Sequence, residues 1–184
     1  SAKAKKKLVD YGLDDAATKA KSSLVRQKWL SNDFYGAVAS VNYNNQHNLF
    51  ATLGGGWNKY DGDHYGYVTW VKKPVDELKP QHLYYDNKTK KVDGNVYTKA
   101  TYEFTKGVSA FADLQYRYVH IQMMGPADAS SAKRKFSYDV NQTFKFFNPK
   151  FGVNYELSTS HRLYASYAIT HREPVRTNFE HNID

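Results

Sequence analysis

The stretch "FGVNYELSTSHRLYASYAIT", Phe151 to Thr170, contains two alternating segments joined by a short polar turn. In each segment every second residue is apolar, which is the period of a β-strand with one apolar and one polar face. The Ser-Thr-Ser turn between them favours a tight reversal of the chain. The stretch therefore predicts a β-hairpin, which ends where His171-Arg172-Glu173-Pro174 interrupts the alternation.

Four earlier stretches of the sequence alternate in the same way. They set Ala, Val, Leu and aromatic residues against Gly, Ser, Thr and Asn, and the aromatic residues gather near the ends of the stretches. Aromatic rings in these places suit the two interfaces of a membrane, where an apolar ring body meets a wet tip. The six predicted strands lie in residues 35–43, 49–58, 96–104, 108–118, 151–157 and 161–170.

The connections between the predicted strands alternate in length. "NNQH", "TKG" and "STSH" are tight turns, whereas about 59–95 and about 121–148 are long, charged, aromatic-rich loops. All tight turns thus fall at one end of the sheet, which is typical of an outer-membrane barrel with short periplasmic turns and long extracellular loops. We predict a barrel segment over residues 29–171, an extracellular loop remnant over 1–28, and the start of the next extracellular loop over 172–184.

A soluble β-sandwich or a lipocalin-like cup would also alternate. Its inward face would be rich in Ile, Leu and Phe, whereas the apolar faces here rely on Ala and Tyr. Its outward face would carry ordinary surface charge, whereas the polar faces here are rich in Gly, Ser, Thr and Asn. We therefore predict an all-β fold, an antiparallel up-and-down meander of about six strands that is part of a larger transmembrane β-barrel. A small complete outer-membrane barrel and a soluble β-rich ligand-binding module remain alternatives.

Alternation assigns side chains to the two sides of the predicted barrel wall. Charged residues on the lumen side need partners, and Arg162 lies across the last turn from Glu156, so we expect these two to pair. The residues predicted to face the lumen are Glu103, Asp113, Arg117, Glu156 and Arg162. The residues predicted to face lipid are Leu114, Tyr116, Val153, Tyr155, Leu163, Tyr167 and Ile169.

Composition narrows the class of protein further. The 184 residues include 16 Tyr and no Cys, and the mean hydropathy is −0.74. No segment approaches the roughly 18 apolar residues of a membrane-spanning helix, so a helical membrane protein is excluded. The net charge of +8 gathers in lysine clusters outside the alternating stretches. We interpret these clusters as solvated loops or as contacts with phosphate-rich lipid headgroups, and predict no nucleic-acid partner.

Motifs of enzymes are missing from the sequence. There is no Cys nucleophile, no G-x-S-x-G or H-E-x-x-H motif and no phosphate-binding glycine loop, so we predict no enzyme activity and no cofactor. The triple glycine Gly54-Gly55-Gly56 lies inside a strand pattern, and no helix follows it. It predicts a bend or the close approach of another element.

The segment "FFNPKFGVNYELSTSHRLYASYAITHREP", Phe146 to Pro174, resembles a recurring hairpin of TonB-dependent outer-membrane receptors. In that family an Asn-Pro-Lys lead-in starts a strand, a short periplasmic turn follows, and the next strand ends in Arg-x-Pro at the extracellular side. The segments Val108 to Tyr118 and Asn48 to Gly66 are also similar to strands of the family. The resemblance covers most of residues 29–178.

The resemblance implies a piece of a receptor barrel of about 22 strands with a plugged lumen, in the outer membrane of a Gram-negative bacterium. It implies a small-molecule nutrient ligand, such as an iron chelate, haem, a vitamin or a glycan. The implied partners are outer-membrane lipid and lipopolysaccharide and, through regions outside this sequence, a plug domain and an inner-membrane energy-coupling protein. Because six strands leave two open edges, we expect the isolated segment to self-associate.

The predicted loop after residue 58 carries Asp61-Gly62-Asp63-His64, with two carboxylates and an imidazole within four residues. A calcium loop needs more oxygen ligands and a closing Glu, so we favour a solvated turn and predict no metal site. In a receptor, the extracellular loops would instead contact the ligand. The candidate ligand-contact residues are Asp61, Asp63, His64, Tyr65, Tyr67, Trp70, His171 and Arg172.

Overall fold

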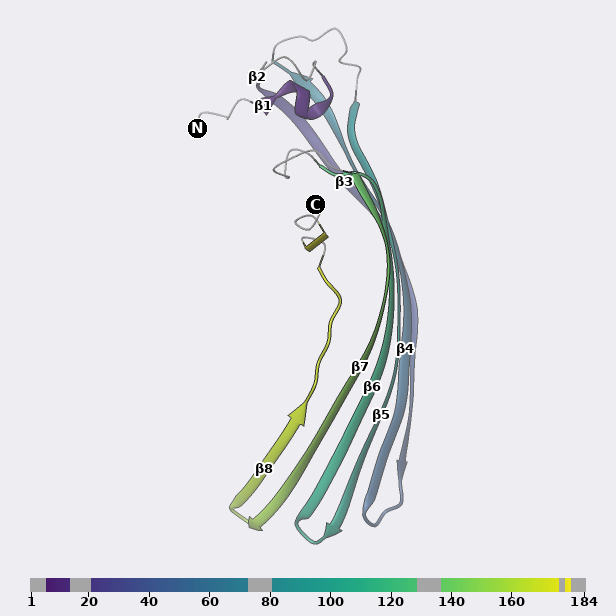
Figure 1. The fold of residues 1–184 in the computed structure, drawn as a ribbon, viewed down its shortest axis with the longest axis vertical. Helices are drawn as coiled ribbons and strands as arrows, with labels where there is room; N and C mark the ends of the chain where they lie inside the picture. The colour runs from purple at the N-terminus through teal and green to yellow at the C-terminus, as the bar shows by residue number, and fades with distance from the viewer. Residues whose placement is uncertain (1–5, 14–20, 73–80, 129–136, 176–177, 180–184) are drawn as a thin grey trace.

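Six long antiparallel strands form one continuous sheet in the computed structural model of the chain (Figure 1). The structure describes residues 6–13, 21–72, 81–128, 137–175 and 178–179. The strands lie side by side in chain order, from β3 to β8, so the sheet is an up-and-down meander. This confirms the predicted all-β antiparallel fold class.

Three small elements precede the main sheet. β1 and β2 pair with each other, and the 3-10 turn η1 follows β1. None of the helical segments within the described ranges is long and apolar enough to cross a membrane. The elements are β1 (Lys6–Lys7), η1 (Leu8–Tyr11), β2 (Lys21–Ser22), β3 (Leu24–Asn44), β4 (Leu49–Val71), β5 (His82–Thr105), β6 (Val108–Pro126), β7 (Ser137–Ser158) and β8 (His161–Ala168).

The strands extend well beyond the alternating stretches that predicted them. β4 and β5 occupy most of residues 59–95, which were predicted to be a loop, and that prediction was wrong. β6 and β7 likewise occupy much of 121–148, and β3 begins within the predicted loop remnant 1–28. Residues 1–5, 14–20, 73–80, 129–136, 176–177 and 180–184, which complete the predicted loops and loop remnants, lie outside the described residues.

Ion pairs help to explain why these polar segments form strands. Lys88 of β5 lies directly opposite Asp63 of β4, and its Nζ is 3.7 Å from the carboxylate. Lys59 and Asp61 are two residues apart on β4, so their side chains share a face and pair at 2.8 Å. The pair between Asp63 and Lys88 favours the pairing of β4 with β5 without an apolar face, while the pair between Lys59 and Asp61 balances charge within β4.

Tight turns join the strands at one end of the sheet, which we call the turn end, as predicted. Between β3 and β4 the side-chain oxygen of Asn45 accepts the backbone N–H groups of His47, Asn48 and Leu49 at 2.9–3.0 Å. Between β5 and β6 lies Gly107, whose φ of +84° suits glycine because it has no Cβ. The opposite end of the sheet, the far end, carries the long strand extensions.

The sheet bows along its strands, and the C-terminal segment runs along its concave side (Figure 1). Glu173 of this segment bonds to Lys91 and Arg117, so those two side chains face the concave side. Strand alternation and the cross-strand register then assign each of the remaining described residues of the main strands either to this concave face or to the opposite, convex face.

The two predicted sets of residues fall on opposite faces. Leu114, Tyr116, Val153, Tyr155, Leu163 and Tyr167 share the convex face, while Ile169 follows the end of β8. Glu103, Asp113, Arg117, Glu156 and Arg162 share the concave face. The expected ion pair between Glu156 and Arg162 is present.

Burial is uneven along the sheet. Near the far end, Leu8, Tyr11 and Leu13 pack against Val68 and Val71 in a small apolar core. Toward the turn end no such cover exists among the described residues, and every residue of β8 is exposed. The chain exposes 13084 Å², whereas a compact soluble protein of this mass would expose roughly 9,100 Å². The sheet is therefore an open wall, and the described residues leave both of its faces uncovered toward the turn end.

Candidate functional site

The chain leaves the sheet directly after β8 and crosses the concave face of the sheet. We call residues 169–175 the exit segment. Its first residue, Ile169, donates its N–H to the carbonyl of Pro149 at 3.0 Å. Pro149 has no N–H to donate in return, so it cannot continue the ladder between β7 and β8. This explains why the strand ends at Ala168 although the apolar alternation reaches Ile169.

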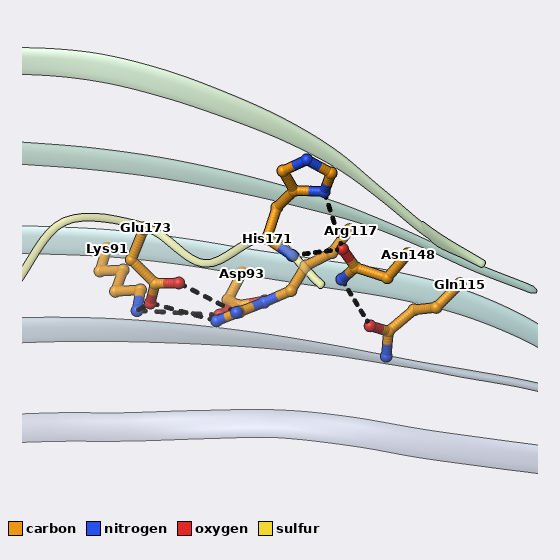
Figure 2. A network of polar contacts seen from close by, with 7 residues as sticks. All are labelled: Lys91, Asp93, Gln115, Arg117, Asn148, His171 and Glu173. Atoms are coloured by element: carbon orange, nitrogen blue, oxygen red, sulfur yellow. Dashed lines mark hydrogen bonds and ion pairs between the residues drawn. The ribbon is translucent and has the colours of Figure 1, made fainter. Parts of the chain in front are cut away.

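Asn148, the residue before this proline, anchors the next part of the exit segment (Figure 2). Its Oδ1 accepts the backbone N–H of His171 at 2.8 Å, and its Nδ2 donates to Oε1 of Gln115 at 3.2 Å. The His171 ring also stacks on Phe146, with ring centroids 6.4 Å apart and planes 7° apart. The exit segment therefore crosses β7 and approaches β6.

Four charged side chains meet at the end of this path, and we call Lys91, Asp93, Arg117 and Glu173 the charge cluster (Figure 2). Glu173 Oε1 is 2.6 Å from Lys91 Nζ, and Glu173 Oε2 is 2.9 Å from Arg117 Nη1. On its other edge the Arg117 guanidinium donates to both oxygens of Asp93, through Nε at 3.0 Å and Nη2 at 2.5 Å. Two cations and two anions thus balance on the concave face.

The two carboxylates of the charge cluster are largely buried. The side chain of Asp93 is 10% exposed and that of Glu173 is 19% exposed. Burial alone would raise the pKa of Glu173, but the hydrogen bond from Lys91 and the positive charges of Lys91 and Arg117 prevail and lower the pKa to about 2. Glu173 is therefore an anion at any physiological pH and binds the exit segment to the wall.

The candidate ligand-contact residues do not converge on one site. Asp61 and Asp63 lie on the convex face of β4, whereas the neighbouring His64 lies on the concave face. The far-end residues Tyr65, Tyr67 and Trp70 share the convex face, and the Tyr65 and Tyr67 rings contact each other edge to face. Within the described ranges, no group of three His, Asp or Glu residues could hold a metal ion.

His171 and Arg172 lie in the exit segment, next to the charge cluster. Of that cluster, only Arg117 had a predicted position on the wall, and no role was predicted for Lys91 or Asp93. The dipeptide Asn148-Pro149 carried the missing signal, because Pro149 has no N–H to continue the pairing of β7 with β8 and Asn148 places a polar side chain beside that point.

A family model described as TonB dependent receptor-like, beta-barrel, matches residues 7–180. No curated protein and no solved structure matches the chain. The family is a class of receptors and transporters and not a class of enzymes, and its barrels lie in the outer membrane of Gram-negative bacteria. The match covers nearly the whole chain and includes all six strands of the sheet and the exit segment. The chain therefore belongs to the TonB-dependent receptor β-barrel family.

Proposed function

We propose that this barrel segment serves a receptor that captures a scarce nutrient outside the cell and imports it through the outer membrane. Iron chelates, haem, vitamins and glycans are the nutrient classes we consider. A plug domain would fill the lumen on the concave side of the wall. Energy would come from an inner-membrane energy-coupling protein, and both partners would act through regions outside this sequence.

The observation that carries this proposal is a continuous row of apolar residues across the convex face. The strand register brings one apolar residue from each of the six strands into line. Such a row suits lipid contact, because lipid replaces the protein core that the convex face lacks. The row consists of Tyr43, Ala51, Ala100, Ala112, Phe151 and Tyr167.

Strand length supports the same proposal. β4 has 23 residues, whereas a tilted strand crosses a bilayer with about 9–11 residues. The apolar convex rows end near Tyr35 and Trp57, whose rings contact each other at a centroid distance of 5.8 Å. Beyond this aromatic pair the strands would rise out of the membrane as a rim. His64 and the other candidate ligand-contact residues of β4 would lie on that rim.

The alternatives receive less support. A small complete barrel would pair β3 with β8, and no such pairing occurs between the described residues of these strands. A soluble binding module would need a core that covers Leu163 and Tyr167, which are 58% and 69% exposed. A larger barrel accounts for both observations, because a segment of its wall would have two open edges and an apolar outer face toward lipid.

Uptake by the receptor that contains this segment tests the proposal. We expect cells that express it to accumulate at least one of four labelled probes, a ferric chelate, haem, cobalamin or an oligosaccharide. Uptake should disappear when the energy-coupling protein is deleted, because import against a gradient needs energy. Accumulation that persists without the energy-coupling protein would contradict the proposal, as would a well-folded, monomeric chain in detergent-free buffer.

A further inference from the structure

We propose that Lys91 and Arg117 form a carboxylate-binding site on the concave wall, and that Glu173 occupies this site as an internal ligand which a carboxylate-bearing nutrient displaces. The inference rests on the proposed function, because the nutrient must reach the concave side of the wall. It goes further by naming the chemical group that this part of the wall recognises.

The site is organised by the wall itself. Asp93 accepts two hydrogen bonds from one edge of the Arg117 guanidinium, through Nε and Nη2, and so fixes the plane of that group. Nη1 then lies 2.9 Å from Glu173 Oε2, and Nη2 lies 3.1 Å from Glu173 Oε1. Lys91 adds an ammonium 2.6 Å from Oε1. Three donors from two paired strands, β5 and β6, therefore converge on one carboxylate.

The present occupant is not part of the wall. Glu173 belongs to the exit segment, whose backbone is held by the Ile169 N–H on Pro149 and the His171 N–H on Asn148. A β-strand of the same length would be fixed by a regular ladder of such bonds. The Lys91 side chain is still 27% exposed and that of Arg117 is 25% exposed, so the described residues of this segment do not seal either cation from the concave side.

Charge explains why a carboxylate would compete. With Glu173 removed, Lys91 and Arg117 would face a single anion, Asp93, and the wall would keep one uncompensated positive charge in a partly buried place. A free carboxylate restores the charge balance and matches the planar donor edge of Arg117. A ligand must compete with an anion that is tethered to the same chain, so its apparent affinity is its intrinsic affinity multiplied by the fraction of time that Glu173 leaves the site open.

Succinate, with the uncharged succinamide as its matched control, provides a simple probe. We would titrate the full receptor, purified in detergent, by ligand-observed nuclear magnetic resonance. Removing the internal competitor with Glu173→Gln should strengthen succinate binding about tenfold, if Glu173 fills the site about nine-tenths of the time. Succinamide should show no gain. Glu156→Gln removes another ion-paired carboxylate from the same face and should bind succinate like the unmodified receptor.

Two double variants test whether the gain arises at this site. Adding Arg117→Gln or Lys91→Gln to Glu173→Gln should abolish it, and using both guards against a variant that fails to assemble. Equal succinate affinity with and without Glu173→Gln would overturn the site, as would a gain that survives in both double variants. The uptake experiment reports separately on the proposed function. A receptor that gains succinate affinity but imports nothing would refute that function and leave the site standing.

Discussion

Tyr97 of β5 lies over Gly54 of β4, and its ring fills the space that a side chain at position 54 would need. The two residues are directly opposed in the sheet, and a Cβ on Gly54 would be 2.5 Å from Cζ of the tyrosine. The triple glycine predicted a bend or a close approach, and at Gly54 the structure shows a close approach by an aromatic ring. Such pairs stabilise a sheet where glycine leaves its surface bare.

Substitutions at the triple glycine should separate two kinds of crowding. We expect Gly54→Ala to destabilise the barrel by about 1–3 kcal/mol, and Tyr97→Ala to relieve most of the added crowding. Gly55→Ala should not be relieved, because its Cβ would meet the backbone oxygen of Asn95 at 2.6 Å. Urea unfolding of the receptor in lipid, analysed as a double-mutant cycle, would measure both. Additive effects of Gly54→Ala and Tyr97→Ala would contradict the contact.

The attachment of the exit segment should depend on pH only in strong acid. The pKa of Glu173 is lowered from 4.5 to about 2, so its stabilising contribution is complete above pH 4.5 and is lost as the pH falls toward 2. We expect a spin label at Val175→Cys to stay immobile at pH 5 and to become mobile near pH 2. The chain has no Cys, so the label is specific within it. Release between pH 5 and 7 would contradict the ion pairs.

Asn148→Ala should loosen the start of the exit segment. The substitution removes the acceptor of the His171 N–H and the donor to Gln115, and a hydrogen bond of this kind contributes about 0.5–1.5 kcal/mol. The contact is exposed, so we expect the low end of this range and a roughly threefold faster amide exchange at His171. Asn154→Ala, on the same face of β7, should leave that exchange unchanged. Equal rates in both variants would exclude the anchoring role.

Adjacent residues of β8 should respond in opposite ways to a new charge. Tyr167→Asp places a carboxylate on the convex face, where we expect lipid, and should cost of the order of 1–3 kcal/mol. Ser166→Asp places the same charge on the concave face and should be tolerated. The amount of receptor in the outer membrane and its heat-modifiable migration would report assembly. Equal assembly of the two variants would count against lipid contact by the convex face.

The two adjacent candidates on β4 should also differ. His64 faces the concave side and lies 3.3 Å from the hydroxyl of Tyr60, whereas Asp63 faces the convex side and pairs with Lys88. If the nutrient enters by the concave side, His64→Ala should raise the ligand concentration needed for half-maximal uptake several-fold. Asp63→Asn should leave it nearly unchanged. No effect of either substitution would remove this part of β4 from the ligand path.

The sequence predicted the strands well where one face is apolar. Around Val108 to Tyr118 the alternation identifies the strand and both of its faces, because lipid contact on one side demands a period of two. The far-end extensions were missed, since Lys59, Asp61 and Lys88 carry no apolar period and only their cross-strand partners reveal a strand. A strand that is polar on both faces therefore cannot be distinguished from a loop by the periodicity of its hydropathy.

The charge cluster could not be predicted from the sequence for a different reason. Arg117 and Glu173 are 56 residues apart along the chain, and their contact depends on where the exit segment turns after β8. Only Pro149 indicates that turn in advance, because it interrupts pairing on the strand beside β8. A sequence pattern can show that a strand ends, but the direction of the chain afterwards depends on contacts with the wall.

Because the exit segment is held by separate attachments, it should respond to a pulling force differently from a strand of the sheet. A tensile force applied beyond Glu173 would load the ion pairs first, then the His171 bond to Asn148 and last the Ile169 bond to Pro149. The attachments would thus peel one by one, at low force. A strand inside the wall shares the same force over a whole ladder of bonds and resists it in shear. The strands of the wall would stay paired while the exit segment detaches and rebinds.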